Sequence, residues 1–141
     1  MIQNFNISKL EEVMKIWLDT NIKAHDFIPE KYWLNNFALV KNLLPQADIL
    51  VYQDNSIIQG FIGITNKSYI AGLFVTGQFQ SRGVGSALIE QCKQLYLLLE
   101  LDVYVKNKVA VNFYKKHGFK IQKEKINDDT KEKEYSMVWR K

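Results

Sequence analysis

The stretch that decides the fold runs from Ser68 to Leu95 and reads SYIAGLFVTGQFQSRGVGSALIEQCKQL. It opens with an apolar run, Tyr69 to Val75, which predicts a strand, and then passes through a polar turn. After the turn, apolar residues recur at helical spacing and predict one buried stripe, formed by Val84, Ala87, Leu88, Gln91, Cys92 and Leu95. The stretch is therefore predicted to form a strand, a loop and a helix that lies on the sheet.

The junction between this strand and this helix carries Gln80 to Ser86, QSRGVGS. Glycines let the backbone approach a ligand, and the first N–H groups of a helix lack partners within it. With the positive end of the helix dipole, these groups can bind an anion. The segment is neither a P-loop, which needs a Lys followed by Ser or Thr, nor a dinucleotide fingerprint, which needs three glycines. The alternative is that Gly83 and Gly85 only permit tight helix packing.

A second motif follows the next predicted strand, Leu99 to Val105, and reads NKVAVNFYKKHGF from Asn107 to Phe119. Asn107 can cap the helix that begins after it. Gly118 can end that helix with a positive φ. Three residues are expected to share one face, with Phe113 toward the core and Tyr114 toward the helix edge: Ala110, Phe113 and Tyr114.

Together the two motifs, Gln-x-x-Gly-x-Gly and Asn-x-x-Ala-x-x-Phe-Tyr-x-x-x-Gly-Phe, resemble two conserved segments of the GNAT superfamily of N-acetyltransferases. The resemblance covers essentially the whole chain and looks closest to small bacterial members. It implies an α/β (α+β) fold with a mixed central sheet of about seven strands and four helices, in a single N-acetyltransferase domain over residues 1–141. It also implies transfer of the acetyl group of acetyl-CoA to a primary amine by direct attack in a ternary complex. The amine could belong to a protein or peptide lysine, an N-terminus or a small molecule, and no metal is expected.

The resemblance further implies where acetyl-CoA, the co-substrate, binds. In that fold the fourth and fifth strands splay apart, and the acyl arm of CoA lies in the gap between them. The backbone of Leu73 to Val75 is expected to pair with the pantetheine as a further strand, and Ser81 to Ser86 to hold the pyrophosphate. The expected cofactor-binding residues are Leu73, Phe74, Val75, Gln80, Ser81, Arg82, Gly83, Val84, Gly85, Ser86, Asn107 and Tyr114.

Two residues are candidates for proton transfer, Tyr114 and His25. Tyr114 is expected to protonate the departing CoA sulfur, and the alternative is a packing aromatic whose hydroxyl meets water. His25 lies in a polar and aromatic loop that usually forms part of the acceptor wall in the superfamily. It could orient or deprotonate the amine, with a pKa near neutrality, or it could only hydrogen-bond Asp26 or a backbone carbonyl. The fourth strand departs from many members because it carries no glutamate general base.

The rest of the chain predicts further elements around these motifs. A short strand, Ile2 to Asn6, precedes a helix that starts with a capping box formed by Ser8 and Glu11 and ends near Thr20. A second helix starts at Pro29 and runs to about Leu44. The remaining predicted strands are Asp48 to Gln53 and Ile57 to Asn66, joined by a hairpin turn at Asp54 and Asn55, and then Lys120 to Ile126 and Glu132 to Trp139.

Composition limits the class of protein. With 141 residues, 47% hydrophobic and 13% aromatic, the chain is an ordinary folded globule. It has no apolar run of membrane-spanning length and no signal peptide, so a cytoplasmic location and no membrane partner are expected. The one cysteine, Cys92, is expected to be a buried core residue and not a nucleophile. A net charge of +4 is spread along the chain, which argues against nucleic acid and suits a polyanionic cofactor.

Two other functions stay open at this point. One is a non-catalytic acyl-CoA-binding sensor module, supported only by the missing glutamate of the fourth strand. The other is a nucleic-acid accessory protein, which rests on charge alone. The sequence leaves the acceptor open, and the protein could be a monomer or a homodimer.

Overall fold

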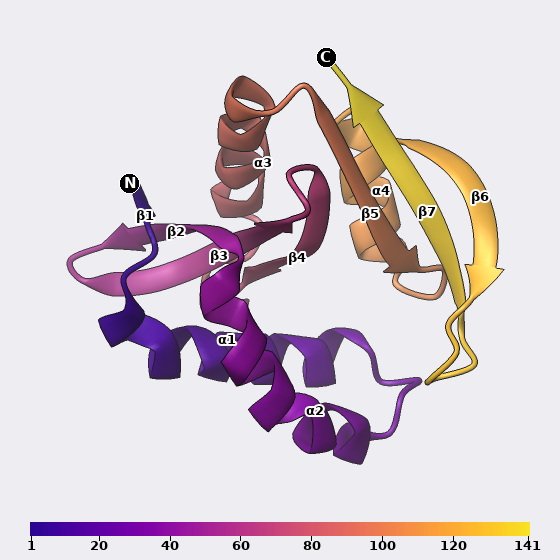
Figure 1. Cartoon of the computed structure of the whole chain (residues 1–141), viewed down its shortest axis with the longest axis horizontal. Coiled ribbons are helices and arrows are strands. Elements are labelled where there is room, and N and C mark those ends of the chain that lie inside the picture. Colours follow the sequence, from indigo (N-terminus) through magenta and orange to yellow (C-terminus); the bar gives the residue numbers. More distant parts are fainter.

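The structure, a computed structural model, describes residues 1–141 as one seven-stranded sheet with four α-helices (Figure 1). The strands are β1 (Ile2–Asn4), β2 (Asp48–Asp54), β3 (Ile57–Thr65), β4 (Tyr69–Val75), β5 (Leu98–Tyr104), β6 (Lys120–Ile126) and β7 (Lys133–Arg140). The helices are α1 (Leu10–Ala24), α2 (Glu30–Leu43), α3 (Val84–Leu95) and α4 (Lys108–Lys116). The predicted α/β fold with a mixed sheet is confirmed.

The sheet has the strand order β1-β2-β3-β4-β5-β7-β6. All neighbouring strands pair antiparallel except β4 and β5, which are parallel. The β2–β3 hairpin turns at Asn55 and Ser56, both with positive φ, one position later than predicted. The last strand, β7, lies between β5 and β6, as the sequence predicts.

Two hydrophobic cores form on opposite faces of the sheet, because apolar side chains alternate along its central strands. On one face, α3 and α4 pack over β3, β4 and β5, and the buried residues there include Leu88, Leu101 and Met137. On the other face, α1 and α2 pack over β2 and β3, with Met14, Trp17 and Trp33 at the centre. In Figure 1, β5, β7 and β6 stand side by side with α4 behind them. Helices α1 and α2 therefore cover only the β1–β4 half of their face.

The two halves of the sheet meet at one narrow joint. Strand β4 pairs with β5 in a single position, Tyr69 opposite Glu100. The Glu100 N–H donates to the Ser68 carbonyl at 2.8 Å, and the Ser68 hydroxyl donates to the Glu100 carboxylate, also at 2.8 Å. Beyond this joint the strands diverge, which agrees with the splay that the sequence resemblance implies.

The predicted capping box at the start of α1 is wrong. Residues Ile7 to Lys9 form a 3-10 turn, and the Asn6 side chain accepts from the Ser8 N–H at 2.9 Å. The first turn of α1 follows at Leu10, and the carboxylate of Glu12 accepts from the Ile58 N–H at 2.8 Å, far away in sequence. Helix α1 also continues to Ala24, one turn beyond the predicted end, since nothing in the sequence after Thr20 breaks it.

The buried stripe of α3 is broader than predicted. Val84, Leu88 and Cys92 are buried as expected, but Ile89 is buried too, because the end of α4 lies beside α3 on the same face. Leu95 is 58% exposed, since it is the last residue of the helix and faces an open hollow. Burial raises the pKa of the Cys92 thiol to about 11, so the thiol stays protonated at neutral pH. Cys92 is therefore a core residue, as predicted.

Candidate active site

The start of α3 is built to receive an anion. Gly83 precedes the helix in the left-handed region, with φ of 84°, and no side chain caps the helix. The first intrahelical bond runs from the Ala87 N–H to the Gly83 carbonyl, which leaves the N–H groups of Val84, Gly85 and Ser86 without helical partners. A methyl group added at Gly83 would meet no atom within 4 Å. Space for a ligand therefore lies directly over the free N–H groups.

Two polar side chains of this loop have different surroundings. The Gln80 side-chain amide donates to the Val75 carbonyl at 2.9 Å, so it ties the loop to the end of β4. The Arg82 side chain is exposed and its guanidinium lies 5.9 Å from the centre of the Phe79 ring. Arg82 can therefore reach a bound anion, whereas the amide of Gln80 already has a protein partner.

A histidine that sequence reasoning missed holds Ser86 in place. The Ser86 hydroxyl lies 3.0 Å from His117 Nε2, and His117 Nδ1 lies 3.3 Å from a carboxylate oxygen of Glu90. His117 ends α4, and its ring packs against Phe113. These contacts fix the Ser86 hydroxyl beside the free N–H groups of α3. The only signal in the sequence was the place of His117 just before the glycine that ends the helix.

Leu73, Phe74 and Val75 lie on the splayed part of β4. They pair with β3 on one side, and no strand pairs with them on the other. Unpaired backbone groups on a strand edge are a template for another extended chain. The side chain of Phe74 packs against Phe61, with ring centres 5.2 Å apart, and so anchors this edge to the core.

Tyr114 points into the core, and the predicted orientation of α4 is wrong. Its side chain is only 8% exposed and lies against Phe119, whereas Phe113 is the half-buried residue at the edge, next to Gly85. Val111 and Tyr114 are three positions apart, so they lie on the same face of α4, and this face is the buried one. Burial alone raises the pKa of the Tyr114 hydroxyl well above its usual range.

His25 and Asn107 meet although 82 positions separate them in the sequence. The Asn107 oxygen accepts from the Ala110 N–H at 3.2 Å, which confirms the predicted cap, and its nitrogen lies 3.1 Å from His25 Nε2. The His25 ring stacks on Trp33 and contacts Tyr104 edge-on. Burial lowers the pKa of His25 to about 4, so the predicted value near neutrality is wrong. Asn107, and not Asp26, is the side-chain partner of the ring, and a backbone hydrogen bond with Asn21 partly opposes the effect of burial on the pKa of His25.

Polar residues on β5 form a second group that sequence reasoning missed. Asp102 accepts from the Tyr69 hydroxyl at 2.8 Å and from the Ser136 hydroxyl at 2.7 Å, and it pairs with Lys125 at 3.0 Å. The available signal was the polar alternation of Glu100, Asp102 and Tyr104 in an otherwise apolar strand. Because side chains of a strand alternate between its two faces, Glu100, Asp102 and Tyr104 all lie on the same face, the one away from α4.

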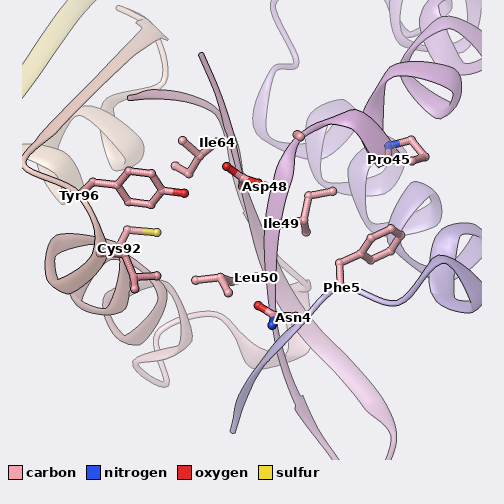
Figure 2. A pocket seen from close by; sticks show the side chains of 11 residues that line it. Asn4, Phe5, Pro45, Asp48, Ile49, Leu50, Ile64, Cys92 and Tyr96 are labelled. Atoms are coloured by element: carbon pink, nitrogen blue, oxygen red, sulfur yellow. The ribbon is translucent and has the colours of Figure 1, made fainter. Parts of the chain in front are cut away.

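A hollow of about 360 Å³ lies elsewhere, between β2 and the C-terminal end of α3 (Figure 2). Its walls are mostly apolar, and Cys92 and Tyr96 face Asp48 and Leu50 across it. The N-terminal end of α3 lies a helix length away, about 18 Å for twelve residues. This hollow is therefore separate from the candidate active site.

A parallel pair of strands that splays beside an uncapped, glycine-rich helix start defines an acyl-CoA N-acyltransferase fold. Residues 24–132 match the family model described as an acetyltransferase (GNAT) domain. The chain belongs to the GNAT family of acetyltransferases.

Relatives of known name agree with this assignment. The peptidyl-lysine N-acetyltransferase YiaC of Escherichia coli (strain K12) is 32% identical over 140 residues, which cover 99% of this chain and 96% of the relative. The solution structure of apo-form YjaB from Escherichia coli superposes with a TM-score of 0.86 and 26% identity, covering 99% of this chain and 96% of that one.

A second solved structure contains acetyl coenzyme A. It is a putative streptothricin acetyltransferase from Bacillus anthracis in complex with acetyl coenzyme A, with a TM-score of 0.60 and 25% identity over 67% of this chain and 62% of that chain. The protein is accordingly an acetyltransferase of a family that transfers acetyl groups from acetyl-CoA to amines.

Two further findings concern the whole chain. None of its helices has the length and apolar character needed to cross a membrane. No group of three or more His, Cys, Asp or Glu residues is arranged to hold a metal ion.

Proposed function

We propose that the enzyme binds acetyl-CoA along the free edge of β4 and at the start of α3, and transfers the acetyl group to the side-chain amine of a lysine in a protein or peptide. The observation that carries the proposal is that the splayed edge of β4 and the uncapped first turn of α3 both present backbone groups without partners. Such groups can pair with an amide-containing arm and with a diphosphate. The lysine acceptor is suggested by the relative YiaC, a peptidyl-lysine N-acetyltransferase.

Each part of the co-substrate has a place in this proposal. The pantetheine arm pairs with the backbone of Leu73 to Val75. The pyrophosphate lies on the N–H groups of Val84, Gly85 and Ser86, and Ser81, Arg82 and Gly83 surround it. Gln80 contributes by holding the loop on β4. Asn107 contributes in the same indirect way, by fixing the start of α4, from which Tyr114 reaches the thioester.

The chemistry requires positioning more than reactive groups. The amine nitrogen forms a bond to the acetyl carbonyl carbon, the carbon–sulfur bond breaks, and sulfur leaves with the electron pair. The nitrogen releases a proton to water, the Tyr114 hydroxyl supplies one to the sulfur, and the tyrosinate regains its proton from water. The raised pKa of Tyr114 keeps that hydroxyl protonated at neutral pH, so it can donate to the thioester throughout the reaction. Holding both reactants in place supplies much of the rate.

His25 serves as a positioning residue in this scheme. With a pKa of about 4 it is neutral at pH 7 and too weak a base to hold the proton of an ammonium group. Its ring and the side chain of Asn107 join the α1–α2 loop to the start of α4. His25 therefore shapes the acceptor side of the site without taking a proton.

Calorimetry of acetyl-CoA binding tests the site. Gly83→Glu places a charged side chain in the space over the free N–H groups and should reduce affinity by at least about tenfold, the effect of losing one charge-assisted contact. Gln94→Glu makes the same charge change on the exposed C-terminal part of α3 and should bind as the parent does.

A further control separates charge and bulk from backbone strain. Gly83→Ala carries the strain of the left-handed conformation, about 1–2 kcal/mol, without the charge. It should melt earlier than the parent yet keep most of the affinity. Equal binding by the parent and a folded Gly83→Glu would place acetyl-CoA elsewhere.

A further inference from the structure

Two carboxylates share the open face of β5 and β7. Asp102 stands opposite Ser136, and Tyr104 stands opposite Glu134. On β5, Leu101 and Val103 alternate with Asp102 and Tyr104 and point into the core under α3 and α4. Asp102 and Tyr104, and with them Glu134, therefore point to the opposite face of the sheet. Helices α1 and α2 lie mainly over the β1–β4 half of the sheet (Figure 1), and only the α1–α2 loop and the first turn of α2 reach Tyr104 and Glu134. A carboxylate here can meet a molecule that approaches from the side away from α3 and α4.

One of the two carboxylates is already satisfied. Asp102 receives hydroxyl groups from Tyr69 and Ser136 and pairs with the Lys125 ammonium. Although its partial burial favours the neutral form, these partners hold the pKa of Asp102 below its usual value. Asp102 is therefore a structural anion that braces β4, β6 and β7 against β5.

The other carboxylate, Glu134, has no ion pair of its own, because Lys125, which stands opposite it on β6, gives its ammonium group to Asp102. Glu134 is only 9% exposed, yet none of the ion pairs of the chain includes it. Burial raises its pKa above the usual value; the Asn127 amide and the Lys125 ammonium oppose this shift, and the charge of Asp102 adds to it. A buried carboxylate that shares its nearest cation with another carboxylate is costly in free energy, so a cationic partner from outside would be stabilised here.

The surroundings of Glu134 suit an alkylammonium group. Burial raises the pKa values of the Tyr32 and Tyr104 hydroxyls most, and the charges of Asp129 and Glu134 add to this effect, so both carboxylates lie near the two side chains. Tyr104 also contacts Phe27 of the α1–α2 loop, with ring centres 5.6 Å apart. Aromatic rings around an anion favour an organic cation, which gains from the charge and from the ring faces. The pocket chemistry therefore fits the end of a lysine side chain.

We propose that Glu134 is the residue that binds the ammonium group of the acceptor, over the open face of β5 and β7 and beside Tyr32 and Tyr104. This inference rests on the proposed function, because it concerns the acceptor side of the same reaction. It assigns to the acceptor a cationic alkylamine, held by one unpaired carboxylate.

A binding experiment without acetyl-CoA tests the inference separately from catalysis. The probe is the capped tripeptide Ala-Lys-Ala, and its control ligand is the same peptide with norleucine, which has the alkyl chain but no charge. Titration followed by NMR should give the parent a preference for lysine of about tenfold or more, the effect of one hydrogen bond to a charged group. Glu134→Gln should abolish that preference.

Two control variants make the result specific. Glu124→Gln removes one negative charge from the exposed strand β6, on the side that faces away from Glu134, and should keep the lysine preference. Glu134→Asp keeps the charge and should keep part of the preference, which covers the case in which the glutamine variant folds poorly. A lysine preference that survives in Glu134→Gln overturns the inference.

Kinetics then tell this inference from the proposed function. In Glu134→Gln the KM for the lysine peptide should rise about tenfold while the KM for acetyl-CoA stays the same. Its melting temperature at pH 7 should not fall, because the variant removes a charge that burial disfavours. If the parent acetylates no amine, the proposed function fails, and the binding titration still decides on Glu134. If the parent acetylates the peptide and the variant does so with an unchanged KM, only the inference on Glu134 fails.

Discussion

Tyr114 is a core residue for which we propose a reactive role as well. The ring lies against Phe119 in the core, and burial of the hydroxyl raises its pKa. A ring fixed in this way holds its hydroxyl in one position, which is what a proton donor to a departing sulfur needs.

Replacing Tyr114 by Phe should separate the two roles. The variant keeps the ring, so the melting temperature should change little and acetyl-CoA should bind as before. Loss of a general acid typically lowers a rate by about 10² to 10⁴, so kcat should fall by that order with a lysine peptide. Release of free CoA thiol measures it. A fall of less than about threefold would mean that CoA leaves as the thiolate or that another group donates the proton.

His25 makes the folded protein sensitive to acid. Its pKa is about 4 in the folded chain and 6.5 for an unperturbed histidine, so between these pH values the unfolded chain binds more protons. The stability that neutral His25 provides is therefore present above pH 6.5 and is lost as the pH falls toward 4. Between pH 6.5 and pH 4, the free energy of unfolding measured with urea should fall more for the parent than for His25→Gln. The difference should be on the order of 3 kcal/mol. Parallel curves for the two proteins would contradict the buried, neutral state of His25.

Helix α4 depends on a cap that also contacts the α1–α2 loop. Asn107 caps the helix through its oxygen and contacts His25 through its nitrogen. Asn107→Ala should therefore lower the free energy of unfolding by about 1–2 kcal/mol, the range for a lost cap with a buried contact. Asn107→Asp keeps the capping oxygen and should lose less. Chemical denaturation of both variants distinguishes a cap from a simple packing effect, because packing alone would make the two losses equal.

Strands were the elements most accurately predicted from the sequence. The predicted bounds of β4 and β6 match the structure, because alternation along a strand and the turns that end it are local properties. The start of α1 was wrong because Asn6, and not Ser8, provides the capping side chain and a 3-10 turn over Ile7 to Lys9 precedes the helix. The burial of Ile89 was missed because the apolar spacing of α3 shows only the face that packs on the sheet. It does not show that the end of α4 lies beside α3.

Across the whole molecule, some parts of the candidate site could be predicted from the sequence and others could not. The glycine loop and the cap at Asn107 came from motifs that lie within about ten residues each, so sequence spacing was enough. Other features depend on how distant strands and helices are arranged. They are the contact of His25 with Asn107, the contact of Ser86 with His117, and the position of the Glu134 carboxylate. Burial also changed the chemistry of His25, which its residue type alone could not reveal.

The single joint between β4 and β5 also links the lifetime of the protein to its metabolic surroundings. A molecule that lies along the open edge of β4 binds only the folded chain, because the unfolded chain offers no such edge. Mass action then raises the free energy of unfolding with the concentration of that molecule, by about 2.7 kcal/mol at a hundredfold excess over its Kd. A cell rich in acetyl-CoA would keep this enzyme longer against proteolysis than a starved one, so the abundance of the catalyst would follow the supply of its co-substrate.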